Sequence, residues 1–182
     1  MMDRAKLEEL VQRAEGAGFS HAGILDASTL WVRQEVRDMC RADKCHLYNR
    51  SWMCPPACGS LEENREKILK YRFGIIVQTT GELEDDYDVE TMMEAGSQQK
   101  KRFFSFRREL LAEYPELLAL SSGGCELCEK CSYPDAPCRF PKDAMPSMEA
   151  FGLVVSDVCT SNGVGYYYGP KTITYTGCYL LY

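Results

Sequence analysis

Residues 73–79 read FGIIVQT, an apolar run whose centre is β-branched. Because β-branched side chains fit a pleated surface and the run has no polar alternation, it predicts a buried strand. On its C-terminal side, an amphipathic pattern over residues 89–113 predicts a long helix that ends near Pro115. On its N-terminal side, Ser60 is a candidate N-cap for a helix that reaches about Tyr71. The centre of the chain therefore predicts helix, strand and helix in succession.

The same alternation extends towards both ends of the chain. Strands that alternate with helices predict an α/β fold, here a mixed β-sheet flanked by helices in a single domain over residues 1–182. This body is expected to carry two cysteine-rich metal-binding loops, at residues 40–58 and 125–138. The further elements expected are helices over 4–16, from 28 or 29 to about 40, from 147 and over 154–161, strands over 21–25 and 117–121, and a hairpin over 163–182.

The composition argues against several classes of protein. Hydrophobic residues make up 45% of the 182 residues and charged residues 26%, which is typical of a globular chain and not of a disordered one. The formal net charge of −6 argues against nucleic acid as a partner, because phosphate binding needs clustered Lys and Arg. No apolar stretch approaches the roughly 20 residues of a membrane-spanning helix, and residues 1–10 lack the apolar core of a secretory signal. We therefore expect a cytoplasmic protein with no membrane partner.

Ten cysteines carry the strongest chemical signal in the sequence. In a reducing cytoplasm this number indicates metal or redox chemistry more than structural disulfides. Eight of the ten fall into two groups of four, separated by a long stretch without cysteine. Two groups of four predict two sets of metal ligands.

The second group has the spacing C-x2-C-x2-C-x6-C over residues 125–138. Three cysteines at such short intervals let one tight loop present thiolates to three irons of a cubane, and a fourth cysteine completes the set. Zinc is the alternative, followed by free thiols, although zinc sites usually combine two distant C-x2-C pairs. Gly123 and Gly124 permit backbone N–H groups to turn towards cluster sulfurs. We interpret the group as the [4Fe–4S] ligands Cys125, Cys128, Cys131 and Cys138.

The first group is less regular, with the spacing C-x4-C-x8-C-P-P-x-C over residues 40–58. Its two prolines fix the turn that follows Cys54. Trp52 is expected to shield the site from water, and His46 is either a loop residue or an alternative ligand. We interpret the group as the ligands of a second [4Fe–4S] cluster, with zinc or a redox-active thiol pair as alternatives: Cys40, Cys45, Cys54 and Cys58.

Two features fall outside these groups. Cys159 and Cys178 are expected to be packed in the core, because free cysteine is among the most buried residue types; the alternatives are an extra ligand or a reactive thiol. Residues 100–102, with Arg107 and Arg108, form a local basic run in the predicted helix. A solvated helix face is the expected role, and a docking patch for an acidic partner or an anion is the alternative.

Three motifs then occur in order: Cys54-Pro-Pro-x-Cys58, the group from Cys125 to Cys138 with Arg139-x-Pro141, and Pro146-Ser-Met-Glu-Ala-x-Gly152. With them the chain resembles, over nearly its whole length, a prokaryotic family of predicted metal-binding proteins, domain of unknown function 2284. The resemblance implies metal bound by cysteine, of the iron–sulfur type, in an anaerobic or oxygen-sensitive setting. It implies no particular reaction.

Three functional hypotheses follow. The leading one is an iron–sulfur protein with two [4Fe–4S] clusters that exchanges single electrons with a redox partner protein, since no other catalytic constellation is visible. The second is an enzyme in which one incompletely ligated cluster binds a small substrate, suggested by the irregular first group. The third is a zinc-stabilised interaction module, in which metal supplies folding energy and the basic helix docks a partner.

Overall fold

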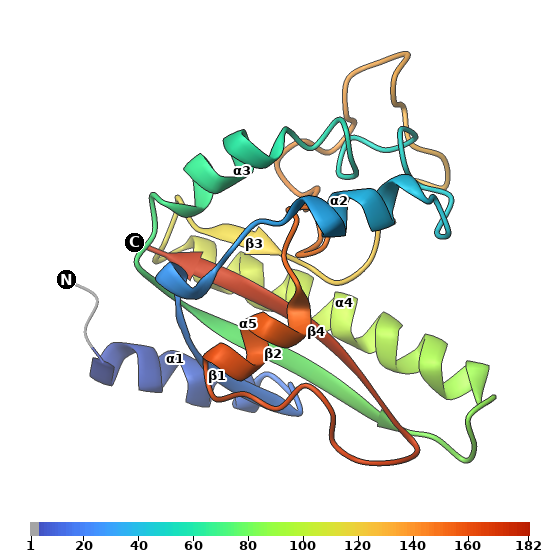
Figure 1. Cartoon of the computed structure of the whole chain (residues 1–182). Helices are drawn as coiled ribbons and strands as arrows, with labels where there is room; N and C mark the ends of the chain where they lie inside the picture. Colours follow the sequence, from blue (N-terminus) through green and yellow to red (C-terminus); the bar gives the residue numbers. More distant parts are fainter. Residues whose placement is uncertain (1–3) are drawn as a thin grey trace.

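The computed structural model describes residues 4–182, so the first three residues of the predicted N-terminal segment lie outside the described part. Helices and strands alternate along the chain (Figure 1). Their order is α1 (Arg4–Gly16), β1 (His21–Asp26), the 3-10 helix η1 (Ala27–Thr29), α2 (Gln34–Arg41), α3 (Leu61–Ile68), β2 (Phe73–Glu82), α4 (Val89–Leu111), β3 (Leu118–Leu120), α5 (Val155–Ser161) and β4 (Thr172–Leu181).

The four strands form one sheet in the order β1-β2-β4-β3, and each neighbouring pair is antiparallel. The predicted mixed sheet is therefore wrong in its strand directions. Strands β2 and β3 do run in the same direction and are joined through helix α4, as in a parallel unit. However, β4 lies between them and is antiparallel to both. The helix–strand alternation correctly predicted the mixed α/β class, but it did not indicate this insertion.

Helices cover both faces of the sheet, as predicted. Side chains alternate along the strands, so Ile75 and Val77 of β2 face one layer while Ile76 faces the other. The first layer is built from α1 and α4 and includes Leu10 and Phe103. The second layer contains η1, the end of α3, the segment 148–153 and α5. Burial on both faces explains why FGIIVQT carries no polar alternation.

Local capping predicted some element boundaries well. Ser60 caps α3 in a capping box: its hydroxyl accepts from the Glu63 N–H at 3.1 Å, and Glu63 Oε2 accepts from the Ser60 N–H at 2.6 Å. The predicted strand over 73–79 and helix over 89–113 are confirmed as β2 and α4, to within three residues. These signals involve residues close in sequence, which is why they could be recognised.

Three predicted elements are wrong. The helix expected from residue 28 or 29 is interrupted, because Val32 pairs with Leu153 and the Arg33 N–H donates to Gly152 O at 2.8 Å; the short η1 and α2 take its place. The helix start at 147 is a series of turns. The hairpin over 163–182 is a loop followed by the single strand β4, which pairs with β2 and β3.

No helix within residues 4–182 has the length and apolar character needed to cross a membrane.

Candidate metal centre

Both cysteine-rich loops lie at one end of the molecule (Figure 1). The first follows α2 and ends where the capping box starts α3, and the second connects β3 with α5. Cys40 belongs to the last turn of α2, whereas the other seven grouped cysteines lie in irregular backbone. Regular elements therefore hold both ends of the first loop, and its centre has irregular backbone.

Three aromatic and polar contacts join the two loops. Trp52 Nε1 donates to Ala136 O at 3.0 Å, and the rings of Trp52 and Tyr133 meet edge to face with centroids 4.9 Å apart. The Tyr133 hydroxyl donates to Asn49 Oδ1 at 2.8 Å. Trp52, which is expected to shield the site from water, therefore packs against the second loop.

The four cysteines of the second group lie together. Burial raises the pKa of Cys125, and negative charge on Cys138, Cys128 or Cys131 raises it further, against a lowering hydrogen bond from the Leu127 N–H. All four line a cavity of about 490 Å³. Cys45 of the first group lines the same cavity, which places the two groups next to each other.

The surroundings of Cys131 favour its thiolate form. Burial opposes its ionisation, but hydrogen bonds from the backbone N–H groups of Tyr133 and Trp52 and from the Ser51 hydroxyl outweigh burial and lower the pKa of Cys131. Hydrogen bonds to sulfur are one of the means by which proteins tune thiolate-bound clusters. Two of these donors come from the first loop, so the second group depends on the first for its environment.

The cysteines of the first group lie close enough to affect the ionisation of Cys54. Burial raises the pKa of Cys54 to about 11, and charge on Cys45, Cys58 or Cys40 raises it further, whereas a hydrogen bond from Ser51 lowers it. Cys54 is buried and Cys45 is exposed, so the group extends from the interior to the surface.

Ser51 connects the two groups. Its side chain is only 2% exposed and lies within hydrogen-bonding reach of Cys54 in the first group and of Cys131 in the second. Its hydroxyl accepts from the Met53 N–H at 3.2 Å. Ser51 therefore lies close to cysteines of both groups.

A buried cation stands beside the first group. Arg37, on α2, is 8% exposed; its Nη2 donates to Gly59 O at 2.8 Å, and no carboxylate among residues 4–182 forms a salt bridge with it. Burial raises the pKa values of Cys40 and Cys58, and the Arg37 charge opposes both rises. Its Nε is buried without a hydrogen-bond partner. A buried cation with an unused donor beside thiols fits a site that carries negative charge when metal is bound.

The third sequence motif contacts the first group. Cys58 Sγ donates to Ala150 O at 3.4 Å and Cys40 Sγ lies 3.9 Å from Glu149 O. The Ser147 hydroxyl accepts from the Ala150 N–H at 3.0 Å and fixes this turn. The motif from Pro146 to Gly152 is therefore a wall of the first cysteine group and not the predicted helix start.

Within residues 4–182, no group of three or more His, Cys, Asp or Glu side chains is arranged to hold one metal ion. The two expected cysteine-rich loops are therefore present, but the described residues do not show the metal-binding cysteine clusters predicted for them. The thiols of Cys40 and Cys58 point towards the backbone carbonyls of Glu149 and Ala150. The donor set itself still fits thiolate-bound metal, because each group combines four cysteines with donors or a cation.

Three residues singled out in the sequence lie away from these groups. His46 is exposed, and no contact joins its side chain to a thiol in the described chain. Cys159 and Cys178 are completely buried in the core layer that includes Ile76 and Leu180. Burial raises the pKa of Cys159 to about 11 and that of Cys178 further still. Both have the packing role expected of them.

Cys159 and Cys178 of the metal-free protein are expected to react with iodoacetamide at pH 8 at least about a hundredfold more slowly than Cys45, because the thiolate is the reactive form and both are inaccessible. Peptide mass spectrometry over time measures this, with urea-unfolded protein as the control in which all ten react alike. A Cys159 that reacts as fast as Cys45 would show a reactive thiol in place of a core residue.

Arg37, Ser51 and Asn64 were missed by the sequence reasoning. With its amide oriented to satisfy both neighbours, Asn64 accepts from Arg37 Nη2 at 2.7 Å and donates to Cys58 O at 3.1 Å. One signal was present: Arg37 precedes Cys40 by three residues, which places both on one face of a helix. The role of Ser51 depends on contacts between loops far apart in sequence.

Comparison with known proteins gives one match. No curated protein and no solved structure is significantly similar to the chain. The model of the family described as "Predicted metal-binding protein (DUF2284)" matches residues 23–181, a range that contains both cysteine groups and the Pro146–Gly152 wall. The chain therefore belongs to this family of predicted metal-binding proteins.

Proposed function

We propose that the chain binds two [4Fe–4S] clusters and transfers single electrons as a redox accessory protein of the cytoplasm. Cys40, Cys45, Cys54 and Cys58 would hold one cluster; Cys125, Cys128, Cys131 and Cys138 would hold the other. The observation that supports this most is that one cavity is lined by all four cysteines of the second group and by Cys45 of the first. Such clusters supply one-electron oxidation and reduction.

The chain's own residues prepare both sites for negative charge. Arg37 places a cation beside Cys40 and Cys58, and backbone N–H groups of Trp52 and Tyr133 donate to Cys131. Trp52 and Tyr133 also line the cavity that contains Cys45 and the second group. Hydrogen bonds, nearby charge and solvent exclusion are the means by which a protein sets a reduction potential.

The proposed redox partner is another protein; neither a nucleic acid nor a membrane is proposed as a partner. The second loop exposes Leu127 and Phe140, whose side chains are 37% and 43% accessible. Electron-transfer proteins usually meet their partners through small, weak interfaces, and two exposed apolar side chains are enough to contribute to one. The net charge of −6 disfavours a nucleic-acid surface.

One observation favours an enzyme as the second candidate. Cys45 is exposed, unlike Cys54, and it faces the cavity of the other group. A ligand at the surface is the easiest to displace, which would leave an open coordination position for a small substrate. In that case Cys45→Ala is expected to keep iron in the first group, whereas Cys54→Ala loses it.

Protein purified without oxygen is expected to contain about eight irons and an equal amount of acid-labile sulfide per chain. Iron, sulfide and zinc analysis with a visible spectrum of the same sample measures this. About four irons together with zinc would assign the first group, residues 40–58, to zinc. Zinc without sulfide would contradict the proposal and favour a zinc-stabilised interaction module.

A further inference from the structure

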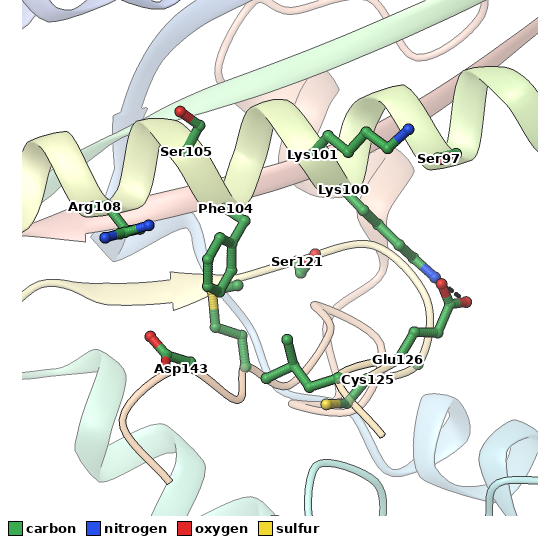
Figure 2. A pocket seen from close by; sticks show the side chains of 13 residues that line it. Ser97, Lys100, Lys101, Phe104, Ser105, Arg108, Ser121, Cys125, Glu126 and Asp143 are labelled. Carbon is green, nitrogen blue, oxygen red and sulfur yellow. Dashed lines mark hydrogen bonds and ion pairs between the residues drawn. The ribbon is translucent and has the colours of Figure 1, made fainter. Parts of the chain in front are cut away.

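A second cavity, of about 460 Å³, lies on the other side of Cys125, between α4 and the segments 121–127 and 143–145. Figure 2 shows the Phe104 ring pointing from α4 into this space, with Cys125 on the opposite wall. Leu127 and Met145 add further apolar surface. The volume lies in the range of small-molecule sites.

The cavity carries excess positive charge. Lys100, Lys101 and Arg108 line it, together with the carboxylates Glu126 and Asp143. Lys100 forms an ion pair with Glu126, drawn in Figure 2, and Asp143 lies 3.9 Å from Arg107 on the neighbouring face of α4. Each of the two carboxylates therefore has a cationic partner. Lys101 and Arg108 are exposed and form no ion pair within residues 4–182.

The helix sets the geometry of these groups. Residues 101, 104 and 108 are spaced by three and four positions, so they share one face of α4. Lys101 and Arg108 are separated by about 10 Å along the helix axis, with Phe104 between them. An aromatic surface with an unpaired cation on each side is suited to a flat ring that carries a negative group.

We propose that this cavity binds a small aromatic anion, with its ring against Phe104 and its carboxylate at Lys101 or Arg108. The basic run of α4 would then have a ligand and not only solvent to contact. Because Cys125 lines this cavity, the bound ligand would lie next to the second thiol group. The role of the ligand as an electron donor or acceptor rests on the proposed function, whereas its binding does not.

Binding is tested with 2-naphthoate, whose fluorescence reports the bound state, on the full chain purified without oxygen. Wild-type protein is expected to bind it saturably with a dissociation constant of about 1 mM or lower. Neutral 2-naphthamide is expected to bind about fivefold more weakly. Raising the salt from about 0.05 M to about 0.5 M should weaken only the naphthoate.

Variants locate the site. Lys101→Ala and Arg108→Ala are each expected to weaken naphthoate binding about threefold, and the double variant about tenfold. Phe104→Ala is expected to weaken both probes about tenfold. Arg65→Ala removes an exposed cation from α3 and is the matched control, with an effect below about twofold.

Absence of saturable naphthoate binding, or equal binding by wild type and the double variant, would overturn the site. Iron and sulfide analysis of the same samples reports separately on the proposed function. Naphthoate binding with the expected variant pattern in a protein that contains zinc without sulfide would support the binding site and overturn only its role in electron transfer.

Discussion

Replacing Cys131 with serine is expected to reduce the iron bound to each chain from about eight atoms to about four. Donors from Tyr133, Trp52 and Ser51 lower the pKa of Cys131, and a serine at this position offers no thiolate to a metal. The other three cysteines of its group would retain a cluster weakly at best, because each thiolate of a cubane binds a different iron. Iron and sulfide analysis on protein purified without oxygen measures the loss.

Cys159→Ala is the matched control for this prediction. It removes a thiol from the core layer and is expected to leave about eight irons in place. Retention of all iron in Cys131→Ser would contradict the assignment of Cys131 as a ligand. Loss of all iron in the same variant would contradict the separate occupation of the two groups, and would indicate that the contacts of Trp52 and Tyr133 make them one unit.

The two cysteine groups could be recognised in the sequence because each is local. Every member of the second group lies within fourteen residues, so spacing alone predicted that one loop would gather them. The chain brings the thiols of each group close enough to influence one another's ionisation. What spacing does not encode is the direction of each side chain; Cys40 and Cys58, for example, point towards the carbonyls of Glu149 and Ala150.

Strand order was harder to predict for a physical reason. Strand β4 pairs with β2 over ten residues, from Phe73 opposite Leu181 to Glu82 opposite Thr172. These partners are about a hundred positions apart, and no turn signal links them. The Tyr- and Thr-rich end of the chain therefore resembled a hairpin, although its partners are the centre and the edge of the sheet.

The electrostatic partners of the thiols were missed for a related reason. Helical periodicity identifies apolar positions such as Val36 as core, but it gives Arg37 the role of an exposed residue. Arg37 is buried because Gly59 O and the Asn64 amide, both beyond the first cysteine loop, receive its donors. Burial of a charge is a property of the tertiary structure and follows from partners that the local sequence does not contain.

Arg37→Met is expected to release iron from the first group to a chelator at least about a hundredfold faster than wild type. In the metal-bound protein the guanidinium faces a negatively charged site, and removing one member of a buried charge pair costs about 3–5 kcal/mol. The loss should be confined to the group of Cys40 and Cys58, whose thiols Arg37 influences. The bleaching of the visible spectrum in excess chelator measures the rate.

The metal-free protein should respond differently to the same substitution. There the thiols beside Arg37 are protonated, because burial raises their pKa values, so its charge has no counterpart. Removing the charge removes the free-energy cost of burying it, which stabilises the folded chain. It also leaves Gly59 O and Asn64 without a donor, which destabilises the folded chain. Because these effects oppose each other, the free energy of unfolding should change by no more than about 1 kcal/mol. Arg37→Lys should restore part of the iron retention, and the exposed Arg65→Met on α3 should change neither quantity. Equal destabilisation of the metal-free and metal-bound forms would contradict an electrostatic role and leave Arg37 as a packing residue.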